Sequence, residues 1–460
     1  MSRYSKTSPS GRSQLRSDNL IRIDAAPHHG LRLLLALFAL ITGARLHAAE
    51  QVTRGPYLQM GTPTSMIVRW RTDPLTKGFV RYGTSLDHIT NQATHNGILA
   101  DHVVLLPKLK PATRYFYRIG SATNKWFNAP DPTYSFVTPP AAGPPRSVRF
   151  WALGDPGTGN TNQMAVREGF RNWSAEHPAD LWLMLGDNAY ATGTDKEYGK
   201  SVFEMYASEH RRMPLWPTLG NHDAFSANSA TQSGVYYDVF TLPTLGQAGG
   251  LPSGTEAYYS FDYAHVHFIC LDSHDTDRSA TGAMATWLKA DLASTARDWI
   301  ICFFHHPPYS KGTHDSDKRT DSGGRLVEMR ENIVPILEQG GVDLVLCGHS
   351  HDYERTYLLD GHYGSSTNLV PSMIRNHGDG RPDGDGAYEK PPGTVPHGGA
   401  VYLVTGSAGQ TSGGKLNHPA MYLSLNKLGS VGVDIDAHEL RVTFVGTKGQ
   451  VRDYFTMRKK

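Results

Sequence analysis

The sequence predicts an α/β protein in which a β-sandwich is flanked by helices and follows a small all-β domain. From Val148 onward, short apolar strand-like runs alternate with amphipathic stretches at helical spacing. Before that point, residues 51–138 hold strand-like runs separated by turn residues. At 460 residues the chain is long enough for two or three domains, each with its own core.

The composition argues against some classes of partner. Charged residues make up 19% of the chain and the formal net charge is +2, so we expect neither a nucleic acid nor a membrane surface as partner. The three cysteines, Cys270, Cys302 and Cys347, each lie inside an apolar run. Buried free thiols are therefore expected rather than a disulfide framework.

The N-terminus has the features of an export signal. A short apolar core at residues 33–42 follows basic residues, and Leu46-His47-Ala48-Ala49 offers small residues for cleavage. The core is shorter than the roughly 20 apolar residues that a membrane span needs, and no later segment reaches that length. Residues 1–49 are therefore predicted to be a leader, and the mature protein periplasmic or secreted.

Residues 50–138 are predicted to form the small β domain. In Ser65–Arg71 the residues Met66, Val68 and Trp70 fall on one face with arginines on the other, which is typical of a strand with one buried face. The stretch 109–117 resembles the tyrosine corner of a fibronectin type III sandwich. The stretch 139–146 is rich in proline and predicts a stiff linker, after which residues 147–460 form the larger domain. The first domain concentrates no acids, bases or ligands, so a scaffold or docking role is expected.

The larger domain begins with a strand at 148–153 and a helix near 160–175, whose inward residues should be Met164, Phe170 and Trp173. Further helices are expected near 195–208, 282–293 and 325–339. Further strands are expected at 181–185, 266–271, 299–304, 342–347, 401–405, 430–436 and 440–446. This alternation predicts sheets between helices, with polar loops gathered at one edge.

Five polar motifs each follow an apolar strand-like run directly. They are Gly154-Asp155-Pro156-Gly157, Gly186-Asp187-Asn188-Ala189-Tyr190, Gly220-Asn221-His222-Asp223, His305-His306-Pro307-Pro308-Tyr309 and Gly348-His349-Ser350-His351. The carboxyl ends of strands are where open α/β sheets collect ligands. Together the motifs supply enough oxygen and nitrogen donors for two metal ions, and the Asp and Tyr oxygens suit a hard cation such as Fe(III).

This set of motifs resembles the metallophosphoesterase superfamily and, within it, the purple acid phosphatases. The resemblance covers nearly all of the mature chain, because plant-type members also carry a fibronectin-like domain first. Tyr190 narrows the assignment, since related phosphodiesterases and nucleases usually open with Asp-x-His, whereas Asp155 is followed by Pro156-Gly157. The resemblance implies a layered α/β/β/α domain.

The resemblance also implies a ligand set and a reaction. The Fe(III) ligands would be Asp155, Asp187, Tyr190 and His351. The ligands of a divalent Zn, Mn or Fe(II) would be Asn221, His305, His349 and the shared Asp187. The implied reaction is the hydrolysis of phosphate monoesters by attack of a metal-bound hydroxide. The implied partner is therefore a small-molecule phosphate ester.

Three further residues receive roles beside the ligands. The family role of His222 is to hold the phosphate or protonate the leaving group, and His314 matches a substrate-binding histidine nine residues after His305. Asp223 could orient the imidazole of His222 from outside the metal shell. His306, next to Pro307, is expected to be a packed structural histidine.

Two alternatives stay open at this stage. The same metal site could act on a phosphodiester or a phytate-like compound, a choice that rests on the rim between residues 360 and 415. The chain could also be an exported binding protein without catalysis, although the complete ligand set argues against that. The sequence leaves the oligomeric state open.

Overall fold

The computed structural model describes residues 49–460 except residue 124. The predicted leader, residues 1–49, lies almost entirely outside the described residues. Among the described residues, no helix combines the length and the apolar character needed to cross a membrane.

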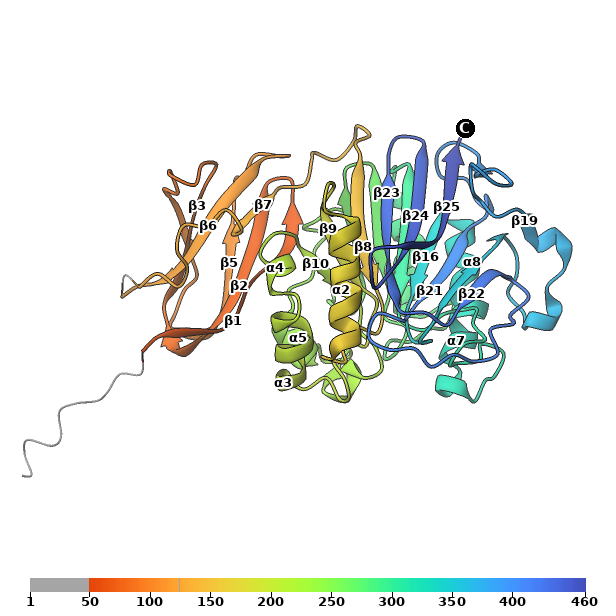
Figure 1. Ribbon diagram of the computed structural model, residues 1–460, viewed down its shortest axis with the longest axis horizontal. Coiled ribbons are helices and arrows are strands. Elements are labelled where there is room, and N and C mark those ends of the chain that lie inside the picture. Colours follow the sequence, from red (N-terminus) through yellow and green to blue (C-terminus); the bar gives the residue numbers. More distant parts are fainter. Residues whose placement is uncertain (1–48, 124) are drawn as a thin grey trace, which may run out of the picture. The chain divides into compact units, whose positions relative to one another are not determined.

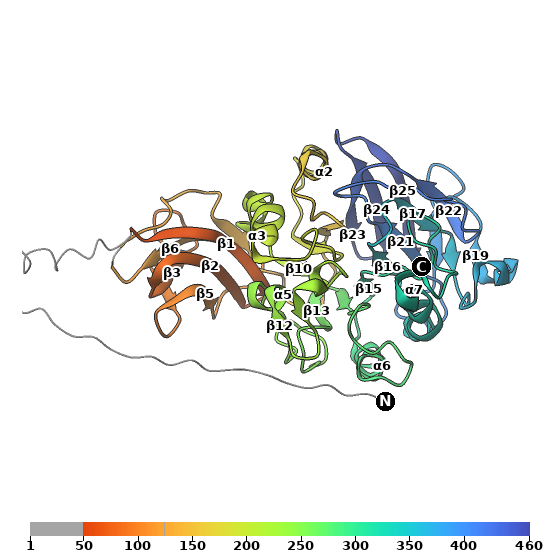
Figure 2. The same cartoon turned by 90° about the horizontal axis from the view of Figure 1, so that it is seen from below.

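The first part of the described chain is a small β-sandwich, as predicted. One sheet has the order β1-β2-β5 and the other β4-β3-β6-β7. Their bounds are β1 Gln51–Thr62, β2 Ser65–Thr76, β3 Gly78–Gly83, β4 Asn91–Thr94, β5 Leu99–Leu106, β6 Arg114–Ser121 and β7 Ser135–Val137. The Tyr115 hydroxyl accepts a hydrogen bond from the backbone N–H of Lys110 at 2.9 Å, which is the predicted tyrosine corner. Figure 2 shows these strands grouped apart from the large sheets.

One face of β2 packs in the core of the sandwich, and the other contacts the second domain. Met66, Val68 and Trp70 are buried in the sandwich core, as the alternation predicts. The arginines opposite are not simply solvated, because Arg69 is also buried and donates to Thr241 at 3.1 Å. Arg71 pairs with Asp195 at 2.8 Å. The first domain therefore packs on the second through β2 and also through β1, whose Tyr57 hydroxyl donates to the Val239 carbonyl at 2.8 Å. We propose residues 139–146, between β7 and the next strand, as the linker.

The second domain is built on two seven-stranded sheets. Their orders are β10-β9-β8-β23-β24-β25-β20 and β13-β14-β15-β16-β21-β17-β22. The first sheet contains β8 Val148–Leu153, β9 Leu181–Met184, β10 Leu215–Pro217, β20 Tyr388–Lys390, β23 Gly429–Ile435, β24 Glu439–Gly446 and β25 Val451–Lys459. The second contains β13 Tyr259–Tyr263, β14 Val266–Cys270, β15 Trp299–Phe304, β16 Leu344–Cys347, β17 Tyr353–Thr356, β21 Val401–Thr405 and β22 Met421–Leu425. The strands β8, β9 and β10 run parallel to one another, as do β15 and β16.

The main core lies where the two sheets face each other. Phe150 of β8 meets Phe268 of β14 with ring centroids 5.2 Å apart, and Tyr353 of β17 stacks on Phe444 of β24 at 4.0 Å. Strands buried on both faces have no reason to alternate polar and apolar residues, which explains the unbroken apolar runs. The three cysteines are buried and unpaired, as predicted.

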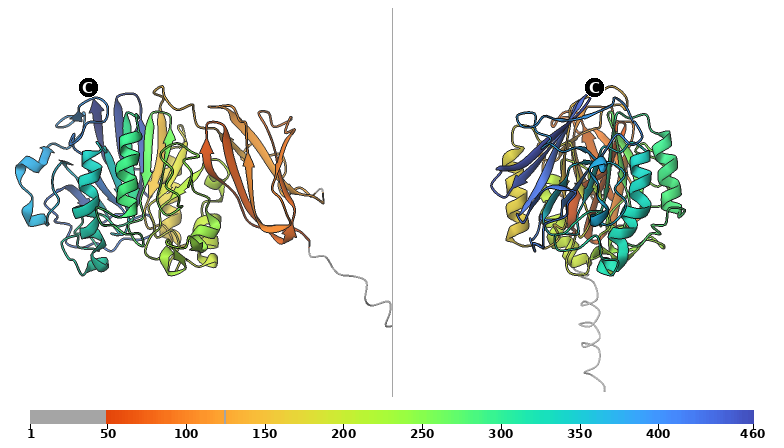
Figure 3. Two further views of the ribbon diagram at one scale, coloured as in Figure 1. Left: turned by 180° about the vertical axis from the view of Figure 1, so that it is seen from behind. Right: turned by 90° about the vertical axis from the view of Figure 1, so that its right-hand side faces the viewer.

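Helices cover the outer faces of both sheets. On the first sheet lies α2 Thr161–Trp173, and on the second lie α6 Ala283–Ser294 and α8 Val334–Gln339. The other helices are α3 Asp195–Tyr198, α4 Ala207–His210, α5 Val235–Val239 and α7 Arg325–Glu328. Figure 1 shows α2 running along the first sheet, where it contacts β23 and β24. Seen from the end in the right panel of Figure 3, α2 (yellow) and the teal helices lie on opposite sides of the sheets. This is the predicted layered α/β architecture.

The helices differ from the prediction in two details. Residues 195–210 and 325–339 are interrupted by π-helical turns at Gly199–Glu204 and Met329–Ile333. The predicted inward position of Met164 is wrong, because this side chain is 43% exposed. Gln163 is buried in its place, since its amide donates to the Ser201 carbonyl at 2.7 Å and to the Tyr206 hydroxyl at 3.1 Å.

A buried histidine on the outer side of the second sheet makes stability depend on pH. The two ring nitrogens of His267 each lie 2.8 Å from a carboxylate, Asp262 on one side and Asp291 on the other. Burial alone would lower the pKa of His267, but the hydrogen bonds to both carboxylates outweigh it and raise the pKa to about 9. The unfolded value is about 6.5. This group therefore stabilises the fold fully below pH 6.5, and its contribution is lost as the pH rises through 9.

We expect a difference of about 3 kcal/mol from this group between pH 6 and pH 9.5, because each pKa unit corresponds to about 1.4 kcal/mol. The measurement is the Tm of the wild type and of His267→Gln at both pH values. Glutamine does not titrate, so the wild type should lose a few degrees more than the variant over that interval. Parallel curves for the two proteins would contradict the assignment.

Candidate metal centre

The five motifs leave the carboxyl ends of five strands from both sheets. Three come from the parallel neighbours β8, β9 and β10, and two from β15 and β16. Asp155, Asp187 and His349 each adopt positive φ, at 56°, 51° and 68°. Such backbone is uncommon for residues other than glycine and is concentrated at functional sites. The turns aim these side chains into the space where the strand ends of the two sheets meet.

Asp187 is held in this space by very close backbone packing. A Cβ atom on Gly220 would stand 2.3 Å from Asp187 Oδ1 and 2.0 Å from its backbone nitrogen. The glycine in the third motif is therefore required for the β10 loop to approach the β9 loop. The backbone N–H of His222 donates to Asp187 Oδ1 at 2.9 Å, which fixes the carboxylate further.

One group of donors surrounds the hydroxyl of Tyr190. This oxygen lies 3.1 Å from Asp155 Oδ1, 3.0 Å from Asp187 Oδ2 and 3.1 Å from His351 Nε2. His351 Nε2 also lies 3.5 Å from Asp155 Oδ1. The four residues assigned to Fe(III) by the resemblance are therefore within ligand-to-ligand distance around one point.

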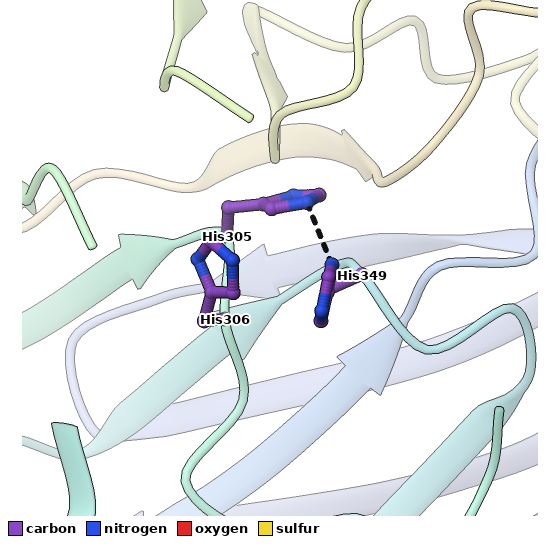
Figure 4. Close-up of side chains that lie close together, drawn as sticks. All are labelled: His305, His306 and His349. Atoms are coloured by element: carbon purple, nitrogen blue, oxygen red, sulfur yellow. Dashed lines mark hydrogen bonds between the residues drawn. The ribbon is translucent and has the colours of Figure 1, made fainter. Parts of the chain in front are cut away.

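A second group surrounds Nε2 of His305. This nitrogen lies 3.0 Å from Asn221 Oδ1, 3.4 Å from Asp187 Oδ1 and 3.1 Å from His349 Nδ1. Figure 4 shows the rings of His305 and His349 turned toward each other, with the contact drawn as a dashed line. Asp187 thus presents one carboxylate oxygen to each group.

The chemistry of both groups fits cations. The other ring nitrogen of His305, Nδ1, donates to the Leu185 carbonyl at 2.9 Å, so in the neutral ring Nε2 carries no hydrogen. It nevertheless faces two oxygens that accept hydrogen bonds and a second imidazole nitrogen. In the first group a single phenol hydrogen faces three acceptors. Metal–ligand distances of about 2.0–2.2 Å place neighbouring ligand atoms about 3 Å apart, as the donors lie here.

The charges at the centre agree with this fit. Asp155 and Asp187 are buried, and within residues 49–460 neither forms an ion pair with lysine or arginine. Burial raises the pKa of Asp187 and lowers the pKa of His305 to about 4, so this imidazole is neutral, the form that binds metals. Burial and the two carboxylates raise the pKa of Tyr190 well above its usual value. Cations would offset both carboxylates and let the phenol ionise.

Two predicted substrate residues border the donors. His222 Nδ1 donates to the Ala191 carbonyl at 2.6 Å, which leaves Nε2 on the side of the donors, 3.9 Å from Asp187 Oδ2. The ring of His314 stacks on that of His349 with centroids 3.8 Å apart. His222 and His314 therefore flank the two donor groups from different loops.

Asp223 lies elsewhere than the sequence suggested. Its carboxylate accepts from the backbone N–H of Gly220 at 2.9 Å, from the side chain of Asn188 at 3.0 Å and from the Tyr198 hydroxyl at 2.6 Å. The expected contact with the His222 imidazole is replaced by the Ala191 carbonyl. Asp223 instead ties the β9 and β10 loops together beneath the donors.

The structure adds residues that sequence reasoning missed. Ser322 Oγ lies 2.6 Å from His349 Nε2, and Asp321 Oδ1 lies 2.7 Å from His314 Nδ1. Both belong to a polar turn without a strand before it, so no motif marked them. His306 is buried and bonded to Ser273 at 2.9 Å, as expected of a packed histidine, although its ring lies beside those of His305 and His349 (Figure 4).

Two known protein families match parts of the chain. Residues 148–353 match the calcineurin-like phosphoesterase family, and residues 54–138 match the purple acid phosphatase N-terminal domain. The chain is 28% identical to Purple acid phosphatase 18 of Arabidopsis thaliana over 67% of this chain and 67% of that protein. It is 27% identical to the phosphoenolpyruvate phosphatase of Allium cepa over 79% of this chain and 69% of that protein.

A solved structure supports the fold. A purple acid phosphatase from yellow lupin seeds superposes with a TM-score of 0.66 at 18% identity, covering 88% of this chain and 75% of that one. Both domains of the chain thus have counterparts among the purple acid phosphatases. The chain thus carries a purple acid phosphatase N-terminal domain followed by a calcineurin-like phosphoesterase domain, and it is a metal-dependent hydrolase of phosphoric esters.

Proposed function

We propose that the protein is a binuclear phosphohydrolase that cleaves phosphate monoesters. The observation that carries the proposal is the shared carboxylate of Asp187, which lies 3.0 Å from Tyr190 in one donor group and 3.4 Å from His305 in the other. A carboxylate placed in this way suits two cations about 3.5–4 Å apart. The name of the Allium cepa relative, phosphoenolpyruvate phosphatase, designates a monoester substrate of that protein and favours the same class here.

In this proposal each of the two donor groups would bind one ion. Asp155, Tyr190 and His351 would hold Fe(III), and Asn221, His305 and His349 would hold Zn, Mn or Fe(II), with Asp187 serving both. When bound, such ions neutralise charge on the phosphoryl oxygens and lower the pKa of coordinated water.

The other side chains at the site would position the phosphoryl group of the substrate. Phosphoryl transfer depends mostly on alignment and on charge stabilisation, so no protein nucleophile is required. His222 keeps Nε2 toward the centre because Nδ1 donates to the Ala191 carbonyl, and its imidazolium form can donate from Nε2 to a phosphoryl oxygen or to the leaving oxygen. His314 is held through Nδ1 by Asp321, and its imidazolium form can donate from Nε2 to the same phosphoryl group.

The test compares nitrophenyl phosphate with bis(nitrophenyl) phosphate on protein of known metal content. We expect two metal equivalents per chain and a higher kcat/KM for the monoester. A higher kcat/KM for the diester would favour the phosphodiesterase alternative. If neither ester is hydrolysed by protein loaded with Fe and Zn or Mn, the proposal fails.

The leader predicted at residues 1–49 would make this an exported enzyme, periplasmic or secreted.

Tyr190→Phe provides a spectroscopic prediction. If the Tyr190 phenolate binds Fe(III), the loaded protein should show a visible ligand-to-metal charge-transfer band, and the variant should lose it. The phenylalanine ring preserves the packing against His222, whose ring centroid lies 4.5 Å away. The measurement is the absorption spectrum at matched iron content. A persistent band would remove Tyr190 from the ligand set.

A further inference from the structure

A short turn beside the metal centre contacts two of its histidines at once. The 3₁₀ segment Asp321–Gly324 lies between the loop of His314 and helix α7. Ser322 Oγ lies 2.6 Å from His349 Nε2 and donates to Asp321 Oδ1 at 2.8 Å. The same carboxylate oxygen lies 2.7 Å from His314 Nδ1. Asp321 is thus linked to His314 directly and to His349 through one hydroxyl.

Backbone conformation and hydrogen bonds within the turn fix the Ser322 hydroxyl beside His349. Ser322 has a positive φ of 49°, followed by glycines at 62° and 84°. Arg325 donates to the Ser322 carbonyl at 2.7 Å, and the other oxygen of Asp321 accepts the backbone N–H of Asp315 at 2.8 Å. A serine in left-handed backbone is strained, so the surrounding contacts must hold it there. The result is a hydroxyl fixed against a buried imidazole.

Ser322 supplies the outer hydrogen-bond partner of His349. Its Nδ1 faces His305 and the second donor group, so Nε2 is the nitrogen left to carry the hydrogen. The other two histidines also have an outer partner. His305 Nδ1 donates to the Leu185 carbonyl, and His351 Nδ1 lies 3.1 Å from Ser412 Oγ. Outer partners of this kind fix the tautomer and orientation of metal-binding histidines. For His349 the partner is Ser322.

We propose that Asp321 and Ser322 are positioning residues that couple the divalent ligand His349 to the substrate-binding His314. Ser322 orients His349, and Asp321 orients both Ser322 and His314. The inference rests on the proposed function and extends it, because it ties the metal ligand and the substrate contact to one carboxylate. Neither residue touches the reacting atoms.

The first test is metal affinity, measured on metal-free protein. Zinc is titrated against a chromophoric competitor into the wild type, Ser322→Ala and Ser322→Gly. We expect both variants to bind the divalent equivalent roughly 10–100-fold more weakly, the usual loss for an outer partner, while the affinity for Fe(III) stays unchanged. Glycine favours positive φ, so a loss shared by both variants does not come from backbone strain.

The matched control is Ser279→Ala, since Ser279 donates to Asp277 at 2.8 Å on an exposed loop. It should bind zinc as the wild type does. Wild-type affinity in Ser322→Gly would overturn the role of Ser322. Should Ser322→Ala fold poorly, Ser322→Gly alone decides, because it relieves the strained position.

The second test separates Asp321 from Ser322. Asp321→Asn keeps the shape and removes the charge, so it should weaken the binding of inorganic phosphate and raise KM roughly tenfold at saturating metal, because charged hydrogen bonds orient His314. Ser322→Gly at saturating zinc should leave KM within about twofold. Asp277→Asn is the control. Equal KM in Asp321→Asn and the wild type would overturn the link to His314.

These outcomes can be told apart from failure of the proposed function. If the wild type hydrolyses no ester, the proposed function fails, while zinc and phosphate binding still report on the turn. If the wild type hydrolyses the monoester and the variants match it in both affinities, the coupling fails alone.

Discussion

Asp187→Asn is expected to lose both metal ions together and to lower kcat/KM by roughly a thousandfold or more. The carboxylate gives one oxygen to each donor group, so removing its charge weakens both sites at once. Charge stabilisation by bound ions is worth several kcal/mol, and every 1.4 kcal/mol is tenfold in rate.

The substitution is well matched to the site. Asparagine tolerates the left-handed backbone found at Asp187 better than most residues, so the turn should persist. It is also no larger than aspartate, which matters because Gly220 leaves no room beside Oδ1. Folding is checked by circular dichroism, and metal content by mass spectrometry after dialysis against a weak chelator.

Asp155→Asn is the matched control. The Asp155 side chain lies near Tyr190 and His351 and not in the second group, although its Oδ2 accepts the backbone N–H of His349. We expect this variant to lose the Fe(III) equivalent and to keep the divalent one. If Asp187→Asn retains one full equivalent bound tightly, the bridging assignment is wrong.

The sequence predicts those parts of this centre that depend on a short local pattern of residues, namely the strands and the polar loops that follow them. An apolar run that ends in glycine and an acid, such as the one before Asp187, specifies both the strand and the loop after it. Parallel strands bring such loops to one edge whatever lies between them. For this reason the ligand candidates from five distant loops gather in two donor groups that share Asp187.

What could not be predicted depends on contacts far apart in the chain. Asp321 and Ser322 lie in a polar turn that resembles any surface turn until Arg325 and Asp315 fix it against His349. Adjacency in the sequence predicts a contact between Asp223 and the His222 ring, yet the Asp223 carboxylate accepts hydrogen bonds from Asn188 and Gly220 instead. Periodicity likewise placed Met164 inward, because it does not register the hydrogen bonds that draw Gln163 into the core.

A second expected result concerns the last strand of the chain. Asp453→Ala should destabilise the protein by about 3–5 kcal/mol, the cost of leaving a buried charge unpaired. Arg355 and Asp453 are both fully buried, and the guanidinium holds the carboxylate at 2.7 and 3.1 Å. Tyr353 adds a hydrogen bond at 2.8 Å and Arg381 one at 2.9 Å. Removing the carboxylate leaves all three donors without their acceptor.

Because a chain of this size can unfold irreversibly, the measurement is the inactivation half-life at fixed temperature together with the apparent Tm. Glu439→Ala removes a half-buried pair with Arg458 at the surface and should leave both nearly unchanged. The double variant Arg355→Met, Asp453→Leu removes both charges and should recover most of the loss, since apolar replacements of buried pairs are often neutral. If the double variant is as unstable as Asp453→Ala, then packing between β17 and β25, rather than the unpaired charge, sets the stability there.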